Sequence, residues 1–356
     1  MQENNIHSTP PKDYAAVADT SVLSSKPEGQ KPGRLFDLDR AKGLAIFLVV
    51  LGHLAREAPP GNEWYGVLKT QLYLFHMPFF MFLSGVTMYL SFKPLSSLSD
   101  YIPYISPKFS RLMPAFFVFG ALTLAGKIIA AKFFPVDNPP TGFVEGLWLI
   151  LTQPIHSAAG SLWYIYVLFL FYALLPLLHR LTSGNLWIML AVGALVHMLP
   201  PSRWFMLGGV TEYLLYLAIG FWVATHYSAW VAWLDRYAYW LLIIFVALLS
   251  LSIFWQRFPK VVLGLFAIPA LHALVRMSWP SKSNILLVMG AYTFSIYLLN
   301  TIAIGLVKGV AGKFIPWGGA WFPLLAALLL TSGILLPILT RRKIFARIPW
   351  LEKMTR

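Results

Sequence analysis

Long apolar stretches recur along the chain after residue 33, and this feature constrains the fold more than any other. Each stretch is close to the length that crosses a bilayer as a helix, and Pro, Gly and basic residues separate one stretch from the next. Hydrophobic residues make up 58% of the 356 residues and charged residues only 12%, which is too apolar for a soluble domain of this length. The pattern predicts an all-α fold, a polytopic integral membrane helical bundle.

We predict about ten transmembrane helices from the positions of these stretches. The expected spans are 37–56, 70–92, 112–133, 161–181, 185–200, 210–226, 238–255, 260–277, 284–307 and 319–339. A further apolar piece at 142–154 is short and is expected to be re-entrant or interfacial. Lys and Arg are more numerous at the segment ends on the side of Arg34, which places both termini in the cytoplasm.

Composition also divides the chain into three parts. Residues 1–33 are rich in Pro, Ser, Lys and Asn and lack apolar periodicity, so we expect a disordered cytoplasmic tail. Residues 34–340 form the expected transmembrane domain. Residues 341–356 are expected to form a basic cytoplasmic C-terminal tail.

Two compositional facts exclude classes of function. The chain has no cysteine, which rules out disulfides, thiolate metal sites and an acyl intermediate carried by cysteine. The formal net charge is +14, but the basic residues lie at the ends of apolar segments and form no contiguous patch, so nucleic acid is not an expected partner. Nothing clusters with the spacing of metal ligands, so no metal is expected.

The stretch that follows Arg34 begins with several charged residues and contains a histidine farther on, within apolar sequence. Lys42 and His53 are eleven residues apart, close to three helical turns, so both side chains project from one helix face roughly 16 Å apart. Burying an ionisable group in a membrane costs about 3 kcal/mol or more unless it is partnered, which makes both residues functional candidates. Taken alone, Lys42 is equally explained as a surface anchor, and His53 as a hydrogen-bonded structural histidine.

The phrase around these two residues, DLDRAKGLAIFLVVLGH, resembles the opening motif of the acyltransferase-3 family, membrane enzymes that O-acylate cell-surface glycans. The family signature is Arg or Lys followed eleven residues later by His, and Lys42 and His53 occupy these positions. Further stretches resemble family motifs in the same order: Phe75–Gly85, Lys108–Pro114, Leu162–Tyr164 and Ser295–Leu299. The resemblance covers about residues 34–340 and is strongest to the fucose 4-O-acetylase-like subgroup.

This sequence departs from the family pattern at three positions. Lys stands at positions 42 and 108, where Arg is more common, and it keeps the charge but lacks the bidentate fork of Arg. Asn300 follows the Ile-Tyr-Leu run at a position where many members carry a histidine. An asparagine does not transfer protons as a histidine does.

The resemblance implies a membrane O-acyltransferase of the plasma (inner) membrane. It moves an acyl group, with acetyl expected, from cytoplasmic acyl-CoA to a hydroxyl of an extracytoplasmic or lipid-linked glycan such as an exopolysaccharide. Acetyl-CoA is then the donor, and the partners are acyl-CoA, the glycan or lipid-linked sugar, and membrane lipid. His53 is the expected catalytic residue, together with Lys42, because a histidine takes a hydroxyl proton near neutral pH.

The polar side chains within the apolar stretches sort by depth under this topology. Lys108 and Arg111, three residues apart at the cytoplasmic side, are expected to hold the phosphates of coenzyme A. The polar residues of the outer half are expected to bind the acceptor: His76, Trp163, Tyr164, Glu212 and Asn300. The alternative treats the two cations as surface anchors, His76 as a helix-packing residue and Glu212 as an interfacial carboxylate.

A protein of another class also fits these features. A transporter or flippase for a lipid-linked glycan needs a polar pathway, basic ends and aromatic residues too. No internal repeat of the kind found in many transporters is evident in the sequence. The sequence also leaves open whether the acyl group passes directly to the acceptor or through an acyl-histidine intermediate.

Overall fold

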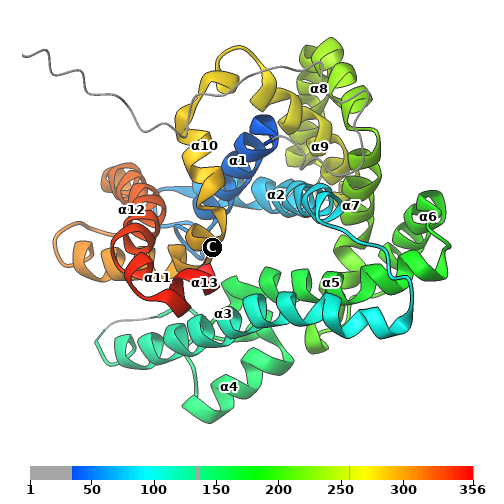
Figure 1. Cartoon of the computed structure of the whole chain (residues 1–356). Coiled ribbons are helices and arrows are strands. Elements are labelled where there is room, and N and C mark those ends of the chain that lie inside the picture. The colour runs from blue at the N-terminus through cyan, green and yellow to red at the C-terminus, as the bar shows by residue number, and fades with distance from the viewer. Residues whose placement is uncertain (1–33, 134–135, 256, 356) are drawn as a thin grey trace, which may run out of the picture. The chain divides into compact units, whose positions relative to one another are not determined.

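The computed structural model describes residues 34–133, 136–255 and 257–355, and the helical unit begins at Leu35 (Figure 1). The described part is helical and contains no strand. The disordered tail predicted for residues 1–33 lies outside the described residues. The helices are α1 (Phe36–Gly52), α2 (Glu63–Leu90), α3 (Tyr101–Ala130), α4 (Phe143–Thr152), α5 (Trp163–Leu181), α6 (Leu186–His197), α7 (Leu207–Thr225), α8 (Tyr227–Phe254), α9 (Lys260–Arg276), α10 (Asn284–Ala291), α11 (Thr293–Ala311), α12 (Phe322–Lys343) and α13 (Pro349–Thr355).

Seven helical segments of the described chain are long and apolar enough to cross a membrane. They are Glu63–Leu90, Leu98–Ala130, Gly160–Leu181, Trp204–Thr225, Tyr227–Phe254, Thr293–Ala311 and Gly319–Arg347. Helices α1 and α9 have 17 residues each, and α4 and α6 are shorter apolar helices. The prediction of an all-α, multi-pass membrane protein is confirmed, whereas the count of ten spans and the cytoplasmic position of both termini stay predictions.

Helices α2 and α8 are the two extremes of burial among these segments. In α2, 72% of the apolar window is buried inside the protein, whereas in α8 only 17% is buried. Helix α2 contacts α1, α7, α8 and α9, and in Figure 1 it lies at the centre of the helices while α8 lies at their edge. Exposed apolar side chains on α8, such as Trp240 and Ile243, are expected to face lipid.

Two glycines let α2 and α7 approach at the level of their backbones. A Cβ on Gly85 would lie 2.1 Å from the Leu217 carbonyl oxygen, and a Cβ on Gly220 would lie 2.0 Å from that of Phe82. Contacts this short leave no room for a side chain, so the close antiparallel packing of the two helices depends on both glycines. This pairing fixes α7, and with it Glu212, against the central helix.

The predicted ninth span, 284–307, is not one continuous helix. The structure breaks it at Tyr292 into α10 and α11. The hydroxyl of Thr293 donates to the Met289 carbonyl at 3.1 Å and to the Gly290 carbonyl at 2.8 Å. The Thr293 hydroxyl thus satisfies carbonyls at the end of α10, at the residue where α11 begins.

Helix α10 packs along α1 and runs antiparallel to it. A Cβ on Gly43 would lie 2.0 Å from the Leu286 carbonyl oxygen, and a Cβ on Gly290 would lie 2.0 Å from that of Asp39. Helix α11 starts anew after this short helix and also contacts α1. The break therefore gives α1 two neighbours from what the sequence pattern presents as a single segment.

Helix α3 begins earlier than the predicted start at residue 112. The Asp100 carboxylate accepts from the backbone amides of Ser96 and Ser97 at 3.1 and 2.9 Å, and α3 then runs from Tyr101. Such a capping interaction satisfies donors at a helix N-terminus. The two predicted donor-binding cations of this region thus lie within a helix and not ahead of one.

The residues predicted to form a basic C-terminal tail are largely helical. Helix α12 continues to Lys343, and α13 packs back onto the helical unit beside α3. Thr355 is fully buried, and its carbonyl accepts from the Ser295 hydroxyl at 2.9 Å. The end of the described chain therefore contacts the first turn of α11.

Candidate functional site

The site is built where α1 ends, because His53 is the residue that caps that helix after Gly52. The last carbonyls of a helix have no helical donor and need another partner. Tyr65 of α2 supplies one: its hydroxyl donates to the Leu51 carbonyl at 3.0 Å and accepts from the Ala55 amide at 3.1 Å. One phenol thus bridges the chain on the two sides of the histidine.

Two more residues of α2 continue this contact. The Lys69 ammonium donates to the carbonyls of Ala55 and Arg56 at 2.7 and 2.8 Å. The Tyr73 hydroxyl donates to the Gly52 carbonyl at 3.3 Å. Three residues at four-residue spacing on one face of the helix form what we call the α2 clamp: Tyr65, Lys69 and Tyr73. The clamp holds the backbone around the histidine in place.

The ring of His53 is held by Asn300 of α11. His53 Nδ1 lies 2.8 Å from Asn300 Oδ1. The Asn300 amide nitrogen donates to the carbonyls of Ile296 and Tyr297 at 2.9 and 2.8 Å, which turns its oxygen toward the histidine. An amide oxygen only accepts, so Nδ1 carries the proton and donates it. In the neutral ring, Nε2 then has the lone pair that a base uses.

The start of α5 supports the turn of α11 that carries Asn300. The Tyr297 hydroxyl donates to the Ser161 carbonyl and accepts from the Tyr164 amide at 3.2 Å. Tyr164, predicted to bind the acceptor, is buried, and its hydroxyl lies 2.7 Å from that of Ser84. The structure therefore places Tyr164 in the framework beneath the histidine.

Two other residues predicted to bind the acceptor also have partners within the protein. His76 is 3% exposed, donates from Nδ1 to the Leu72 carbonyl at 2.6 Å, and packs edge-on against the ring of Tyr73, with centroids 4.9 Å apart. Trp163 stacks on Tyr213 with centroids 5.3 Å apart. His76 thus supports the α2 clamp, and Trp163 contacts the turn of α7 that carries Glu212.

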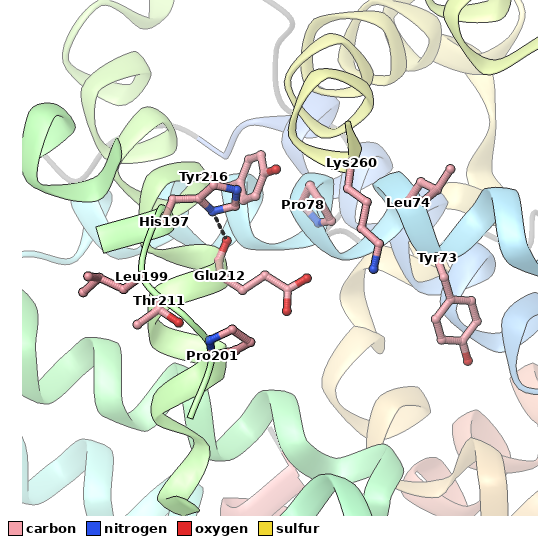
Figure 2. Close-up of a pocket in the computed structure, with 10 residues that line it drawn as sticks. All are labelled: Tyr73, Leu74, Pro78, His197, Leu199, Pro201, Thr211, Glu212, Tyr216 and Lys260. Carbon is pink, nitrogen blue, oxygen red and sulfur yellow. Dashed lines mark hydrogen bonds between the residues drawn. The ribbon is translucent and has the colours of Figure 1, made fainter. Parts of the chain in front are cut away.

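A pocket lies beside the α2 clamp and is lined by residues of α2, α6, α7 and α9 (Figure 2). Its lining residues are Tyr73, Leu74, Pro78, His197, Leu199, Pro201, Thr211, Glu212, Tyr216 and Lys260. Figure 2 shows the Glu212 carboxylate and the Lys260 ammonium directed toward one another across the hollow. Sequence reasoning singled out Glu212 but missed Lys260, since a lysine at a helix start resembles any other surface anchor and only the fold brings it opposite the acid.

The predicted donor-binding cations of α3 lie over aromatic rings. Lys108 Nζ is 3.9 Å from the centroid of the Tyr104 ring, one turn earlier on the helix. The Arg111 guanidinium is 5.6 Å from that of Phe294 in the first turn of α11. Arg111 also lines a second pocket together with residues of α13: Pro349, Glu352 and Lys353. The two cations therefore share an end of the protein with the α10–α11 junction.

Lys42 lies in the second turn of α1, with its ammonium 3.8 Å from the Asp39 carboxylate. Both side chains are partly exposed, at 25% and 18%. Lys42 and His53 belong to the same unbroken helix and its cap, so α1 connects one of the predicted functional cations with the predicted catalytic histidine.

A second ionic cluster, which the sequence did not reveal, ties the start of α1 to α8 and α9. The Arg276 guanidinium contacts the carboxylates of Asp37 and Asp235 at 2.6 and 2.7 Å. The Tyr227 hydroxyl also donates to Asp37, at 3.1 Å, and the fully buried His272 lies 3.6 Å from the same carboxylate. Within the ranges that the structure describes, no three His, Cys, Asp or Glu residues gather as metal ligands. The cluster serves as an anchor between helices.

Comparison with known proteins gives two similarities. A family model described as an acyltransferase domain, that of the acyltransferase-3 family, matches residues 35–342. Nodulation protein NolL of Mesorhizobium japonicum (strain LMG 29417 / CECT 9101 / MAFF 303099) is 26% identical over 224 residues. This alignment covers 62% of the chain and 55% of the relative, so the chain spans about half the length of that curated protein. No solved structure matches the chain significantly.

Proposed function

Since this chain belongs to the acyltransferase-3 family and is an acyl-transferring membrane enzyme, we propose that it acetylates a glycan with His53 as the base. The acetyl group comes from cytoplasmic acetyl-CoA and goes to a hydroxyl of an extracytoplasmic or lipid-linked glycan such as an exopolysaccharide. The plasma (inner) membrane is the proposed location.

The observation that carries this proposal is the hydrogen bond of 2.8 Å between His53 Nδ1 and Asn300 Oδ1. It fixes the tautomer in which Nε2 is unprotonated and available to accept a proton. Within the described part of the chain, Nε2 has no hydrogen-bond partner. Asn300 replaces a histidine common in the family, but its role here requires acceptance of a hydrogen bond and not proton transfer.

The reaction needs few groups. His53 Nε2 takes the proton of the acceptor hydroxyl as its oxygen attacks the thioester carbonyl. The tetrahedral intermediate then collapses, the C–S bond breaks, and the coenzyme A sulfur leaves with the proton that the imidazolium returns. A relay through an acetylated His53 uses the same nitrogen as nucleophile, and both routes depend on the same lone pair.

Basic residues at the other end of α1 are the proposed donor site. Lys42, Lys108 and Arg111 supply positive charge for the phosphates of acetyl-CoA. Arg111 is exposed and lines a pocket, and Lys108 is partly exposed, so a ligand can reach both side chains. Under the proposed topology this end faces the cytoplasm, where acyl-CoA is made.

Mass spectrometry of the host's surface and lipid-linked glycans tests the proposal. A deletion strain is restored with wild type, with His53→Ala, or with His226→Ala as a matched control, because His226 is exposed and lies at the end of α7. We expect one acyl mass increment to disappear on deletion and to return with wild type and His226→Ala only. Unchanged acylation with glycan accumulating on the cytoplasmic side would instead favour a flippase.

A further inference from the structure

The pocket of Figure 2 offers more hydrogen-bond acceptors than strong donors. Its acidic residue, Glu212, offers a carboxylate that only accepts, and this side chain is exposed to the hollow. The ion pairs of the described residues do not include Glu212 or Lys260. The two charged groups therefore face a common space that they leave open between them.

A proline in α2 adds a backbone acceptor to this pocket. Pro78 lies inside the helix and has no N–H, so the Leu74 carbonyl one turn earlier lacks its helical donor. Leu74 and Pro78 both line the pocket. Because this carbonyl lacks its helical N–H and its residue lines the pocket, a ligand hydroxyl can serve as a donor to it.

Two further side chains present their accepting sides. His197 Nδ1 donates to the Glu212 backbone carbonyl at 2.9 Å, so its Nε2 has the lone pair. The Thr211 hydroxyl donates to the Gly208 carbonyl at 2.9 Å and keeps its oxygen lone pairs for a ligand. The pocket thus gathers several acceptors around one strong donor, the Lys260 ammonium.

The pocket shares one residue, Tyr73, with the α2 clamp that holds the chain around His53. Tyr73 lines the pocket and, through its hydroxyl, holds the Gly52 carbonyl one residue before His53. Helix α9 packs closely against two of the lining residues, because a Cβ on Gly264 would lie 2.7 Å from the Tyr216 hydroxyl and 3.0 Å from Pro78. A ligand in this pocket therefore lies against the wall that positions the end of α1.

From these groups we infer that the pocket is the subsite for the acceptor sugar. It recognises a pyranose that has several free hydroxyl groups as hydrogen-bond donors and one group that accepts a hydrogen bond from Lys260. This inference rests on the proposed acetyl transfer and specifies which groups of the acceptor the pocket binds. Glu212, His197 and the Leu74 carbonyl accept from ring hydroxyls, and Lys260 donates to a hydroxyl or ring oxygen of the same sugar.

Saturation-transfer NMR on the full chain in nanodiscs tests the subsite without turnover. The probes are methyl α-D-glucopyranoside, mannopyranoside and galactopyranoside, methyl α-L-fucopyranoside, and the per-O-methylated form of each. We expect saturation of at least one free glycoside and none of its per-O-methylated form, which has no donors. Glu212→Leu and Lys260→Met should each abolish the signal, whereas His53→Ala and the exposed-surface control Glu145→Gln should keep it.

A kinetic measurement separates this inference from the proposed reaction. With the glycan fraction of a deletion host as acceptor, Glu212→Gln should raise the KM for acceptor about tenfold and leave the KM for acetyl-CoA unchanged. An unchanged acceptor KM, binding of the per-O-methylated probes, or no binding of any glycoside would overturn the subsite while transfer by the wild type continued. Absence of transfer by the wild type would overturn the reaction itself.

Discussion

The two ends of the helical unit hold the side chains that we propose to be functional in different ways. At the end where α1 stops, directed hydrogen bonds fix the groups, as the α2 clamp holds the chain around His53 and Asn300 holds its ring. At the end where α1 starts, the proposed donor-binding residues Lys108 and Arg111 lie over aromatic rings. The hydrogen bonds fix both the position and the direction of a side chain, whereas the contacts with rings fix little more than its position.

The difference matches what each end has to do. A hydrogen bond between neutral groups contributes about 0.5–1.5 kcal/mol, one from a charged group such as Lys69 about 1.5–3 kcal/mol, and both constrain angle as well as distance. A cation over a ring gains about 0.5–1 kcal/mol at an exposed site and keeps much of its freedom. Acid–base chemistry requires a pre-organised group, whereas binding a flexible, polyanionic cofactor benefits from side chains that adjust.

The largest effect expected from breaking this comparison is at Asn300. Replacing it with Leu removes the acceptor for His53 Nδ1, so the tautomer is no longer fixed and kcat should fall about 100-fold or more. Asn300→Asp keeps an oxygen at that position and should retain far more activity. Initial rates with acetyl-CoA decide this, and Asn284→Leu, at an exposed asparagine at the start of α10, is the control. Equal rates for Asn300→Leu and wild type would contradict the assignment.

A smaller effect is expected in the α2 clamp. Lys69→Met removes the donor to the carbonyls of Ala55 and Arg56, so we expect kcat to fall about tenfold and Tm by about 3 °C or more. Lys69→Arg should restore part of both values. Thermal unfolding in detergent and initial rates measure these changes, with Lys313→Met on an exposed turn as the control. A lower Tm with unchanged kcat would make Lys69 purely structural.

At the donor end the expected change is in binding alone. Arg111→Ala should raise the KM for acetyl-CoA about tenfold with kcat unchanged, because one charge opposite the phosphates is lost. The matched control is Arg236→Ala, since Arg236 also lies over a ring, that of Tyr237 at 5.5 Å, but on the lipid-exposed helix α8. If Arg111→Ala lowers kcat as strongly as Asn300→Leu, the contrast between the two ends is wrong.

The smallest effect is expected at Lys42. Its ammonium is 3.8 Å from Asp39 and partly exposed, so Lys42→Arg, which keeps the charge, should stay within about twofold of wild type in KM and kcat. Lys42→Met should raise the KM for acetyl-CoA severalfold. Steady-state kinetics at varied acetyl-CoA provide both values. A large loss of kcat in Lys42→Arg would show that position 42 requires a specific geometry and not only a charge.

Local sequence predicted the all-helical class and singled out His53 as a candidate, but it did not predict the hydrogen bond between His53 and Asn300. Apolar stretches near bilayer length predict membrane helices because the backbone has no other way to satisfy its polar groups in lipid. The spacing of Lys42 and His53 correctly placed both on one helix or its cap. Asn300 was noted as a departure from the family pattern, but its partner 247 residues away in sequence was not evident.

The remaining features arise from contacts between distant helices. The α2 clamp looks, in sequence, like two tyrosines and a lysine at the entrance of a span, and only the end of α1 gives them acceptors. The break at Tyr292 was missed because apolar periodicity continues through it, while the Thr293 hydroxyl that closes α10 is a single polar atom. Lys260 becomes a candidate binding residue only because the fold places it across the pocket from Glu212 of α7.

The central claim is that His53, held by Asn300, carries the acetyl transfer, and a radiolabel assay on purified protein tests it most directly. Wild type, His53→Ala and His226→Ala are reconstituted in liposomes with acetyl-labelled acetyl-CoA and the glycan fraction of a deletion host. The account predicts labelled glycan from wild type and His226→Ala, and none from His53→Ala although it binds acetyl-CoA with unchanged Kd. Label transferred by His53→Ala at the wild-type rate would contradict the account.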